Sequence, residues 1–169
     1  KKGSCQLDRV TKARILDMPG TYSLNASSMD ESLVVELLLN KNDPDFPDIA
    51  VVVTDVENLK RNLLLFTQIK DLQIPTVLVI NMSDQMQRKG IKIDLEKLEE
   101  KLNTSVVLVS TRDNSGLDQL KQVLLDYRSI PSVPILDPAT IDQDYFESLS
   151  KAFPNQPLYK LWLVITQDV

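Results

Sequence analysis

The chain has 169 residues, of which 43% are apolar, so it is long enough to bury a sizeable core. Acidic residues outnumber basic ones by 24 to 19 and no long run of Lys or Arg occurs, which argues against nucleic acid or an anionic lipid surface as a partner. There is no histidine and a single cysteine, Cys5, so we expect neither an internal disulfide nor a transition-metal site in this chain.

The N-terminal part of the chain predicts a strand followed by a helix. Residues 13–16 form a short apolar-containing run that stops at a Pro-Gly turn, as a strand does before a loop. Ser28 and Glu31 have the spacing of a capping box, and apolar residues recur behind them at helical intervals. We therefore expect a helix over residues 30–39.

The middle of the chain alternates between buried-strand and helix patterns. Runs rich in β-branched and other apolar residues are typical of strands covered on both faces, and they occupy residues 49–53, 76–80 and 106–109. Each is followed by an apolar stripe at helical spacing, over residues 59–69, 95–102 and 117–124. Asp94 is expected to cap the second of these helices. The alternation favours an α/β fold built on a doubly wound, mainly parallel sheet with right-handed crossovers.

The pattern changes after residue 128. Three prolines fall between residues 129 and 138, which favours an extended linker. Beyond it, apolar residues at helical spacing predict two amphipathic helices, over residues 145–153 and 158–165. We therefore divide the chain into a sheet-containing domain (residues 1–128), a linker (residues 129–138) and the beginning of a helical domain (residues 139–169).

Polar motifs stand at three of the expected strand ends. They are Asp17-x-x-Gly20, Asn81-Met82-Ser83-Asp84 and Ser110-Thr111. The carboxyl ends of parallel strands meet at one edge of a sheet, where such folds bind their ligands, so we expect the motifs to share a site. Each motif by itself also fits an ordinary turn or helix cap, and it is their order at successive strand ends that favours a ligand site.

The second and third motifs suit the recognition of guanine. Guanine offers two adjacent donors, N1–H and the 2-amino group, and a carboxylate such as Asp84 accepts both in a bidentate pair. Adenine lacks this donor pair and would leave the carboxylate unpaired, at a cost of about 1–3 kcal/mol. Asn81 is expected to tie the loop together and meet the other edge of the base. Ser110 and the backbone of Thr111 are expected near the guanine carbonyl oxygen.

The first motif suits the phosphate end of a nucleotide. An aspartate after a strand can hold Mg²⁺, commonly through water, and a glycine lets the backbone approach a terminal phosphate. Asp17 and Gly20 fit these two roles. Because such a loop moves when the γ-phosphate is lost, residues 19–28 are the candidate switch.

Together these motifs resemble those of the translation-factor-related GTPases, and within them the cytosolic domain of the ferrous-iron transport B proteins. Residues 17–24 resemble the third GTPase motif of that family, with its Thr-Tyr-Ser-Leu extension. Residues 81–84 resemble the fourth motif, in which Met82 stands where other GTPases have lysine, and residues 110–112 resemble the fifth. Residues 55–63 are similar to the family's segment after the next strand.

This resemblance, which extends over residues 1–127, implies a slow GTPase that uses GTP or GDP and Mg²⁺. It also implies a place at the cytoplasmic face of a bacterial inner membrane, where a helical region links the nucleotide switch to a membrane domain of the same transporter that passes Fe²⁺ inward. No apolar run is longer than five residues, far below the roughly 20 of a membrane-spanning helix, so we expect the chain itself to be soluble. Thr21 stands where many relatives have the glutamine that orients water, so the resemblance assigns no catalytic residue. The nucleotide contacts that it implies are at Asp17, Gly20, Asn81, Met82, Asp84, Ser110 and Thr111.

The chain departs from that family in one respect, because no Gly-x-x-x-x-Gly-Lys-[Ser/Thr] sequence occurs in it. That loop supplies the N–H groups and the lysine that bind the phosphates. We therefore expect the first strand, the phosphate loop and the first switch to lie upstream of Lys1, and this chain to bind GTP weakly or not at all and to be inactive in hydrolysis. A sheet without that strand has an unpaired edge, which favours pairing between copies as a homo-oligomer.

Two other interpretations stay open. A non-catalytic interaction module would use the sheet and the C-terminal helices only to couple to a membrane or a partner protein. A ribosome-assembly GTPase shares the motifs but usually carries a basic RNA-binding appendage, of which the sequence shows none.

Overall fold

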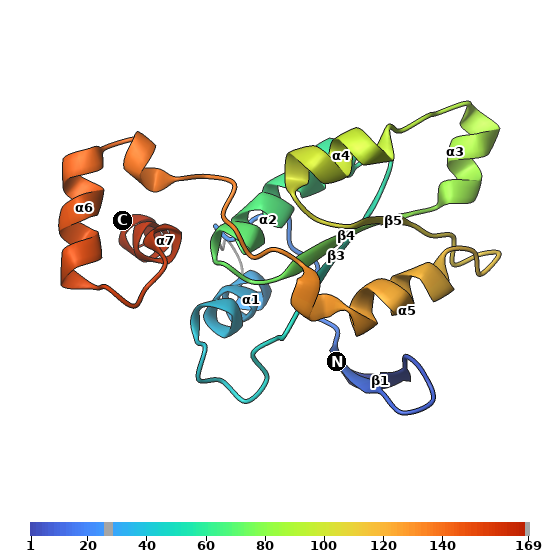
Figure 1. Ribbon diagram of the computed structural model, residues 1–169, viewed down its shortest axis with the longest axis horizontal. Coiled ribbons are helices and arrows are strands. Elements are labelled where there is room, and N and C mark those ends of the chain that lie inside the picture. The colour runs from blue at the N-terminus through green and yellow to red at the C-terminus, as the bar shows by residue number, and fades with distance from the viewer. Residues whose placement is uncertain (26–28, 168–169) are drawn as a thin grey trace.

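The computed structural model describes residues 1–25 and 29–167 (Figure 1). Its strands are β1 (Lys2–Gln6), β2 (Lys12–Leu16), β3 (Ala50–Asp55), β4 (Thr76–Asn81) and β5 (Val106–Leu108). Its α-helices are α1 (Met29–Leu39), α2 (Leu59–Asp71), α3 (Ser83–Lys89), α4 (Leu95–Leu102), α5 (Leu117–Leu125), α6 (Gln143–Ala152) and α7 (Leu158–Gln167). Short 3-10 turns lie at Tyr127–Ser129 and Pro138–Thr140. The expected α/β fold with a parallel sheet is confirmed.

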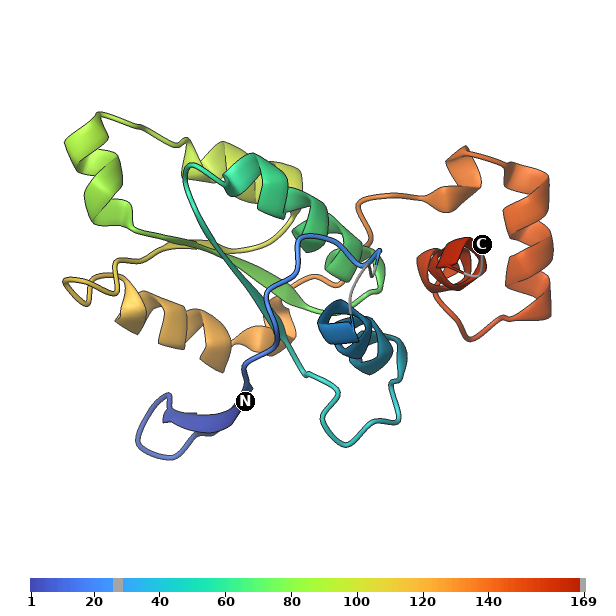
Figure 2. The same cartoon turned by 180° about the vertical axis from the view of Figure 1, so that it is seen from behind.

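The parallel sheet has the strand order β3-β4-β5 and is covered on both faces. Figures 1 and 2 show α2 and α4 on one face and α5 on the other. Side chains alternate along β4, so that Leu78 and Ile80 share an apolar cluster with Phe66 of α2, whereas Val77 and Val79 belong to a cluster packed against α5. Because apolar residues are needed on both faces, the sequence of β4 is almost entirely apolar.

β1 and β2 form an antiparallel hairpin, in which Lys2 pairs with Leu16. Within the described residues, this hairpin shares no strand pairing with the parallel sheet. The outer edge of β3 is unpaired there, and the side chains of Val51 and Val53 are 38% and 59% exposed. The sequence did not predict β1, because its side chains are mostly polar and exposed and its conformation depends on pairing with β2.

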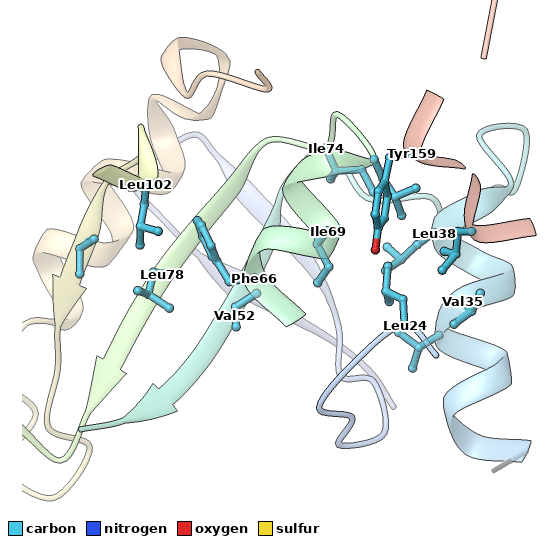
Figure 3. Packing of buried hydrophobic residues seen from close by; sticks show 14 of the residues in the cluster. Leu24, Val35, Leu38, Val52, Phe66, Ile69, Ile74, Leu78, Leu102 and Tyr159 are labelled. Atoms are coloured by element: carbon cyan, nitrogen blue, oxygen red, sulfur yellow. The ribbon is translucent and has the colours of Figure 1, made fainter. Parts of the chain in front are cut away.

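The two C-terminal helices lie at one end of the molecule, beyond the linker (Figure 1). α7 nevertheless packs on the N-terminal half of the chain, because Tyr159 and Leu163 share one apolar cluster with Leu24, Val35 and Leu38 (Figure 3). No helix in the described ranges is long and apolar enough to cross a membrane.

The helix caps and boundaries can be compared with those predicted from the sequence. The predicted cap of α4 is confirmed, because the side chain of Asp94 accepts the N–H of Lys97 at 3.1 Å. The capping residue predicted for α1, Ser28, lies outside the described residues. α3 was not predicted, because its sequence is polar and carries no apolar stripe.

Candidate nucleotide-binding site

The ends of β4 and β5 border a pocket of about 200 Å³. Its lining residues are Asn81, Met82, Asp84, Gln85, Ser110, Thr111 and Arg112. The structure thus brings together the residues of the second and third motifs that were predicted to contact a nucleotide, namely Asn81, Met82, Asp84, Ser110 and Thr111. It adds Gln85 and Arg112, which the sequence did not assign to a contact.

The turn between β4 and α3 gives the pocket its shape. Met82 has a φ of 61°, in the left-handed region that a bulky side chain rarely adopts. The chain thereby reverses from the strand into the helix, and the N–H of Ser83 donates to the carbonyl of Val109 at 3.1 Å. Asn81 before the turn and Asp84 after it consequently line the same pocket.

Side-chain hydrogen bonds tie the two loops of the pocket to each other. Oδ1 of Asn81 accepts the main-chain N–H of Thr111 at 3.3 Å. The hydroxyl of Ser110, which is fully buried, donates to Oδ1 of Asp84 at 3.1 Å. The loop after β5 therefore holds the side chains of both Asn81 and Asp84 in place at the pocket.

Asp84 is surrounded by cationic and polar groups. Its Oδ2 pairs with the guanidinium of Arg88 one turn later in α3, and Arg112 lies 3.9 Å from the same oxygen. Burial raises the pKa of Asp84, but hydrogen bonds from Arg88 and Ser110 and the charges of the two arginines outweigh it, so the pKa lies below its usual value. Asp84 is therefore ionised at neutral pH, the state in which both oxygens accept N–H donors.

A second pocket, of about 260 Å³, lies beside the first and shares Asn81 and Met82 with it. Its other lining residues are Tyr22, Val53, Thr54, Asp55, Asn58 and Asn62. The carboxylate of Asp55 accepts the main-chain N–H of Asn58 at 2.9 Å and the side-chain amide of Asn58 at 2.9 Å. These bonds, with the side-chain bond from Asn58 as the largest cause, hold the pKa of Asp55 below its usual value.

Sequence reasoning did not assign this second set of residues to a site. The resemblance of residues 55–63 to a family segment was the signal present, but it carried no role. Asp55 ends β3, and Asn58 and Asn62 follow it at helical spacing, so this polar stripe was a further signal in the sequence. Asn62 contributes by donating to the hydroxyl of Thr54 at 2.7 Å, a contact between α2 and β3 that sequence spacing does not reveal.

Asp17 and Gly20 lie just after β2, where both are exposed, and neither lines the two pockets. Tyr22 from the same loop does reach the second pocket. Across the part of the chain that the structure describes, no group of three or more carboxylates or thiols is placed to hold a metal ion. A single carboxylate fits Mg²⁺ only where nucleotide phosphates and water supply the other ligands, so the assignment of Mg²⁺ to Asp17 stays a prediction.

Comparison with known proteins decides the family. Residues 1–124 match the family model described as ferrous iron transport protein B. The chain belongs to the ferrous iron transport protein B (FeoB) family. The Fe(2+) transporter FeoB of Escherichia coli is 33% identical over 156 residues, which are 88% of this chain and 20% of that protein. The FeoB of Leptospira biflexa is 35% identical over 111 residues, 66% of this chain and 16% of that protein, so the chain spans about a fifth or less of these curated relatives.

Solved structures of FeoB have the same fold. The apo cytosolic domain of the T. maritima FeoB iron transporter matches with a TM-score of 0.81 at 27% identity, over 94% of this chain and 63% of that chain. The cytosolic domain of L. pneumophila FeoB matches with a TM-score of 0.79 at 31% identity, over 95% of this chain and 70% of that chain. The FeoB G-domain of Methanococcus jannaschii matches with a TM-score of 0.69 at 32% identity, over 75% and 78% of the two chains. The T. maritima domain has also been solved in GDP and GMPPNP forms.

Proposed function

We propose that this chain is the guanine-nucleotide-binding, regulatory part of a bacterial Fe²⁺ transporter, placed at the cytoplasmic face of the inner membrane. The observation that carries the proposal is the pocket at the carboxyl edge of the sheet, where Asn81, Asp84 and Ser110 converge. The GDP and GMPPNP forms of the T. maritima relative support a guanine nucleotide as the ligand.

Asp84 would select the base. Its ionised carboxylate is oriented by Ser110 and would accept N1–H and the 2-amino group of guanine, replacing the exposed guanidinium of Arg88. The ion pair with Arg88 is an exposed contact within one helix, so its loss costs at most about 1 kcal/mol. Adenine offers no such donor pair and would leave the carboxylate desolvated without a partner.

The phosphates would bind elsewhere, at a segment outside the sequence shown. The unpaired edge of β3 and the exposed Val51 and Val53 on it support a further strand and helix between the hairpin and the parallel sheet. A phosphate loop on that unit would lie near the loop of Asp17 and Gly20, through which we expect Mg²⁺ and the γ-phosphate to be sensed. The 169-residue chain by itself should then bind GTP weakly and hydrolyse it poorly.

The test is a calorimetric titration of GDP and ADP into a form of the protein extended upstream of Lys1. We expect GDP to bind at least about tenfold more tightly than ADP. The 169-residue chain, titrated in parallel, should show a large loss of affinity for GDP. Equal affinities for the two nucleotides would contradict the role of Asp84.

A further inference from the structure

The buried amide of Gln68 in α2 joins two segments that are far apart in the chain. Its Oε1 accepts the main-chain N–H of Leu24 at 2.7 Å, in the loop that follows Gly20. Burial raises the pKa of Tyr159 in α7, and the side chain of Gln68 opposes this rise, which places the amide next to the Tyr159 hydroxyl. Leu24, Tyr159 and Gln68 are 0%, 4% and 8% exposed, and Figure 3 shows Tyr159 with its hydroxyl pointing toward Leu24. An amide accepts and donates at the same time, so Gln68 can hold both partners.

The other end of this loop also lies on α2. The guanidinium of Arg61 stacks 3.5 Å from the centroid of the Tyr22 ring, a cation–π contact. Arg61 and Gln68 are two helical turns apart and therefore on the same side of α2. Residues 22–24 consequently run along the helix, with Tyr22 at the second pocket and Leu24 beside α7.

The linker is attached to α2 independently of Gln68. Oδ1 of Asp71 accepts the N–H groups of Ile135 and Leu136 at 2.7 and 2.9 Å. The ammonium of Lys70 donates to the carbonyls of Asn103 and Pro131 at 2.6 and 3.0 Å. Lys70 and Asp71 are 0% and 3% exposed, so the start of the helical region is fixed at the end of α2 while α7 meets the loop at a separate point.

We infer that Gln68 is a positioning residue that transmits the position of residues 21–24 to α7. A ligand that displaces Tyr22 or Gly20 would shift Leu24 along α2, and the shared amide of Gln68 would alter the packing of Tyr159. The connection between residues 21–24 and α7 is inferred from the contacts of Gln68, Arg61 and Tyr159 and does not depend on the proposed function. Only the identity of the ligand that moves the loop rests on the proposed function.

Trp162, the only tryptophan, reports on α7 because its ring packs edge-on against Tyr159 at 5.6 Å between centroids. Arg61→Gln releases Tyr22, and we expect the emission of Trp162 to shift to longer wavelength and its quenching by acrylamide to increase. In a Gln68→Met background the same change should have no further effect. Lys60→Gln, which removes a neighbouring exposed charge, is the matched control and should leave Trp162 unchanged.

An unchanged Trp162 signal in Arg61→Gln would overturn the proposal, and so would an equal change with and without Gln68. Should circular dichroism show that Gln68→Met does not fold, Tyr159→Phe replaces it, because it removes only the hydroxyl. Tyr159→Phe should also speed hydrogen exchange of the Leu24 amide, and unchanged exchange would contradict the shared amide. These measurements need no nucleotide. They can therefore contradict the role of Gln68 without contradicting the proposed function, which equal binding of GDP and ADP would contradict.

Discussion

The hydroxyl of Ser110 donates to Oδ1 of Asp84 at 3.1 Å, although Ser110 lies in the loop after β5 and Asp84 in the first turn of α3. One oxygen of the carboxylate is thereby oriented from β5, while the other pairs with Arg88 from the same helix. The direction in which Asp84 accepts hydrogen bonds is set by the loop after β5 rather than by α3 alone. Base selectivity is therefore expected to depend on both strand ends.

Asp84→Asn should change which purine the site prefers. An asparagine amide accepts one N–H but presents its own donor to the 2-amino group. This should weaken the binding of guanine by about 1–3 kcal/mol. Xanthine carries a carbonyl in place of the 2-amino group, so its nucleotide should bind more tightly to Asp84→Asn than to the wild type. Titration of GDP and the xanthine analogue into the upstream-extended form measures the change. Asp118→Asn, at a fully exposed carboxylate on α5, is the control, and an unchanged preference in Asp84→Asn would contradict the assignment.

The titration of Asp84 tests the contacts around its carboxylate without any ligand. Because its pKa is lowered from 3.8 in the folded chain, ionised Asp84 stabilises the fold above the unfolded pKa, and this contribution is lost as the pH falls through the folded value. Arg88→Gln removes a hydrogen bond and a charge that lower the pKa, so the pKa should rise. Carbon-detected NMR of the carboxyl group measures it. Arg9→Gln, at an exposed site in the hairpin loop, should leave the titration unchanged.

The parallel sheet was predictable from the sequence because its information is local. The runs at residues 49–53, 76–80 and 106–109 became β3, β4 and β5 within one or two residues at each end, since each is a continuous run of mostly apolar and β-branched residues. β1 was not predicted because its polar side chains form no pattern, and the strand depends on pairing with residues 12–16 across a hairpin loop. α3 was not predicted because its sequence is polar apart from Met86 and carries no apolar stripe.

The candidate site likewise contains residues that the sequence predicted and residues that it did not. Asn81, Asp84 and Ser110 follow directly after buried strands, so the topology rule for parallel sheets was sufficient to bring them together. Thr54 and Asn62 meet through packing of α2 on β3, which no local pattern encodes. The split between the hairpin and the parallel sheet likewise appears only in three dimensions.

Gly116→Ala should destabilise the fold more than the equivalent change at Gly90. Both glycines have positive φ, 76° and 66°, which costs an alanine about 1–2 kcal/mol. A Cβ at Gly116 would also lie 2.0 Å from the carbonyl oxygen of Leu108, whereas one at Gly90 would meet nothing within 4 Å. Urea unfolding of the two variants measures the difference. Equal losses would mean that the loop beside Ser110 relaxes freely around the added methyl group.

Asp71→Ala should weaken the attachment of the linker far more than Asp71→Asn. Alanine removes the acceptor of the two part-buried hydrogen bonds from the N–H groups of Ile135 and Leu136, which are worth about 1 kcal/mol each. Asparagine retains an Oδ1 in the same place. In urea, Asp71→Asn should therefore have about the same free energy of unfolding as the wild type, and Asp71→Ala a lower one.

The pH dependence separates the hydrogen bonds of Asp71 from its charge. Burial raises the pKa of Asp71, against the opposing effects of the two N–H groups and Lys70. A raised folded pKa means that its contribution to stability is fully present below the unfolded pKa and is lost as the pH rises through the folded value. The stability of the wild type relative to Asp71→Asn should thus decline as the pH rises above 3.8. A constant difference across that range would show that the carboxylate is held in the linker contact without any cost of burying its charge.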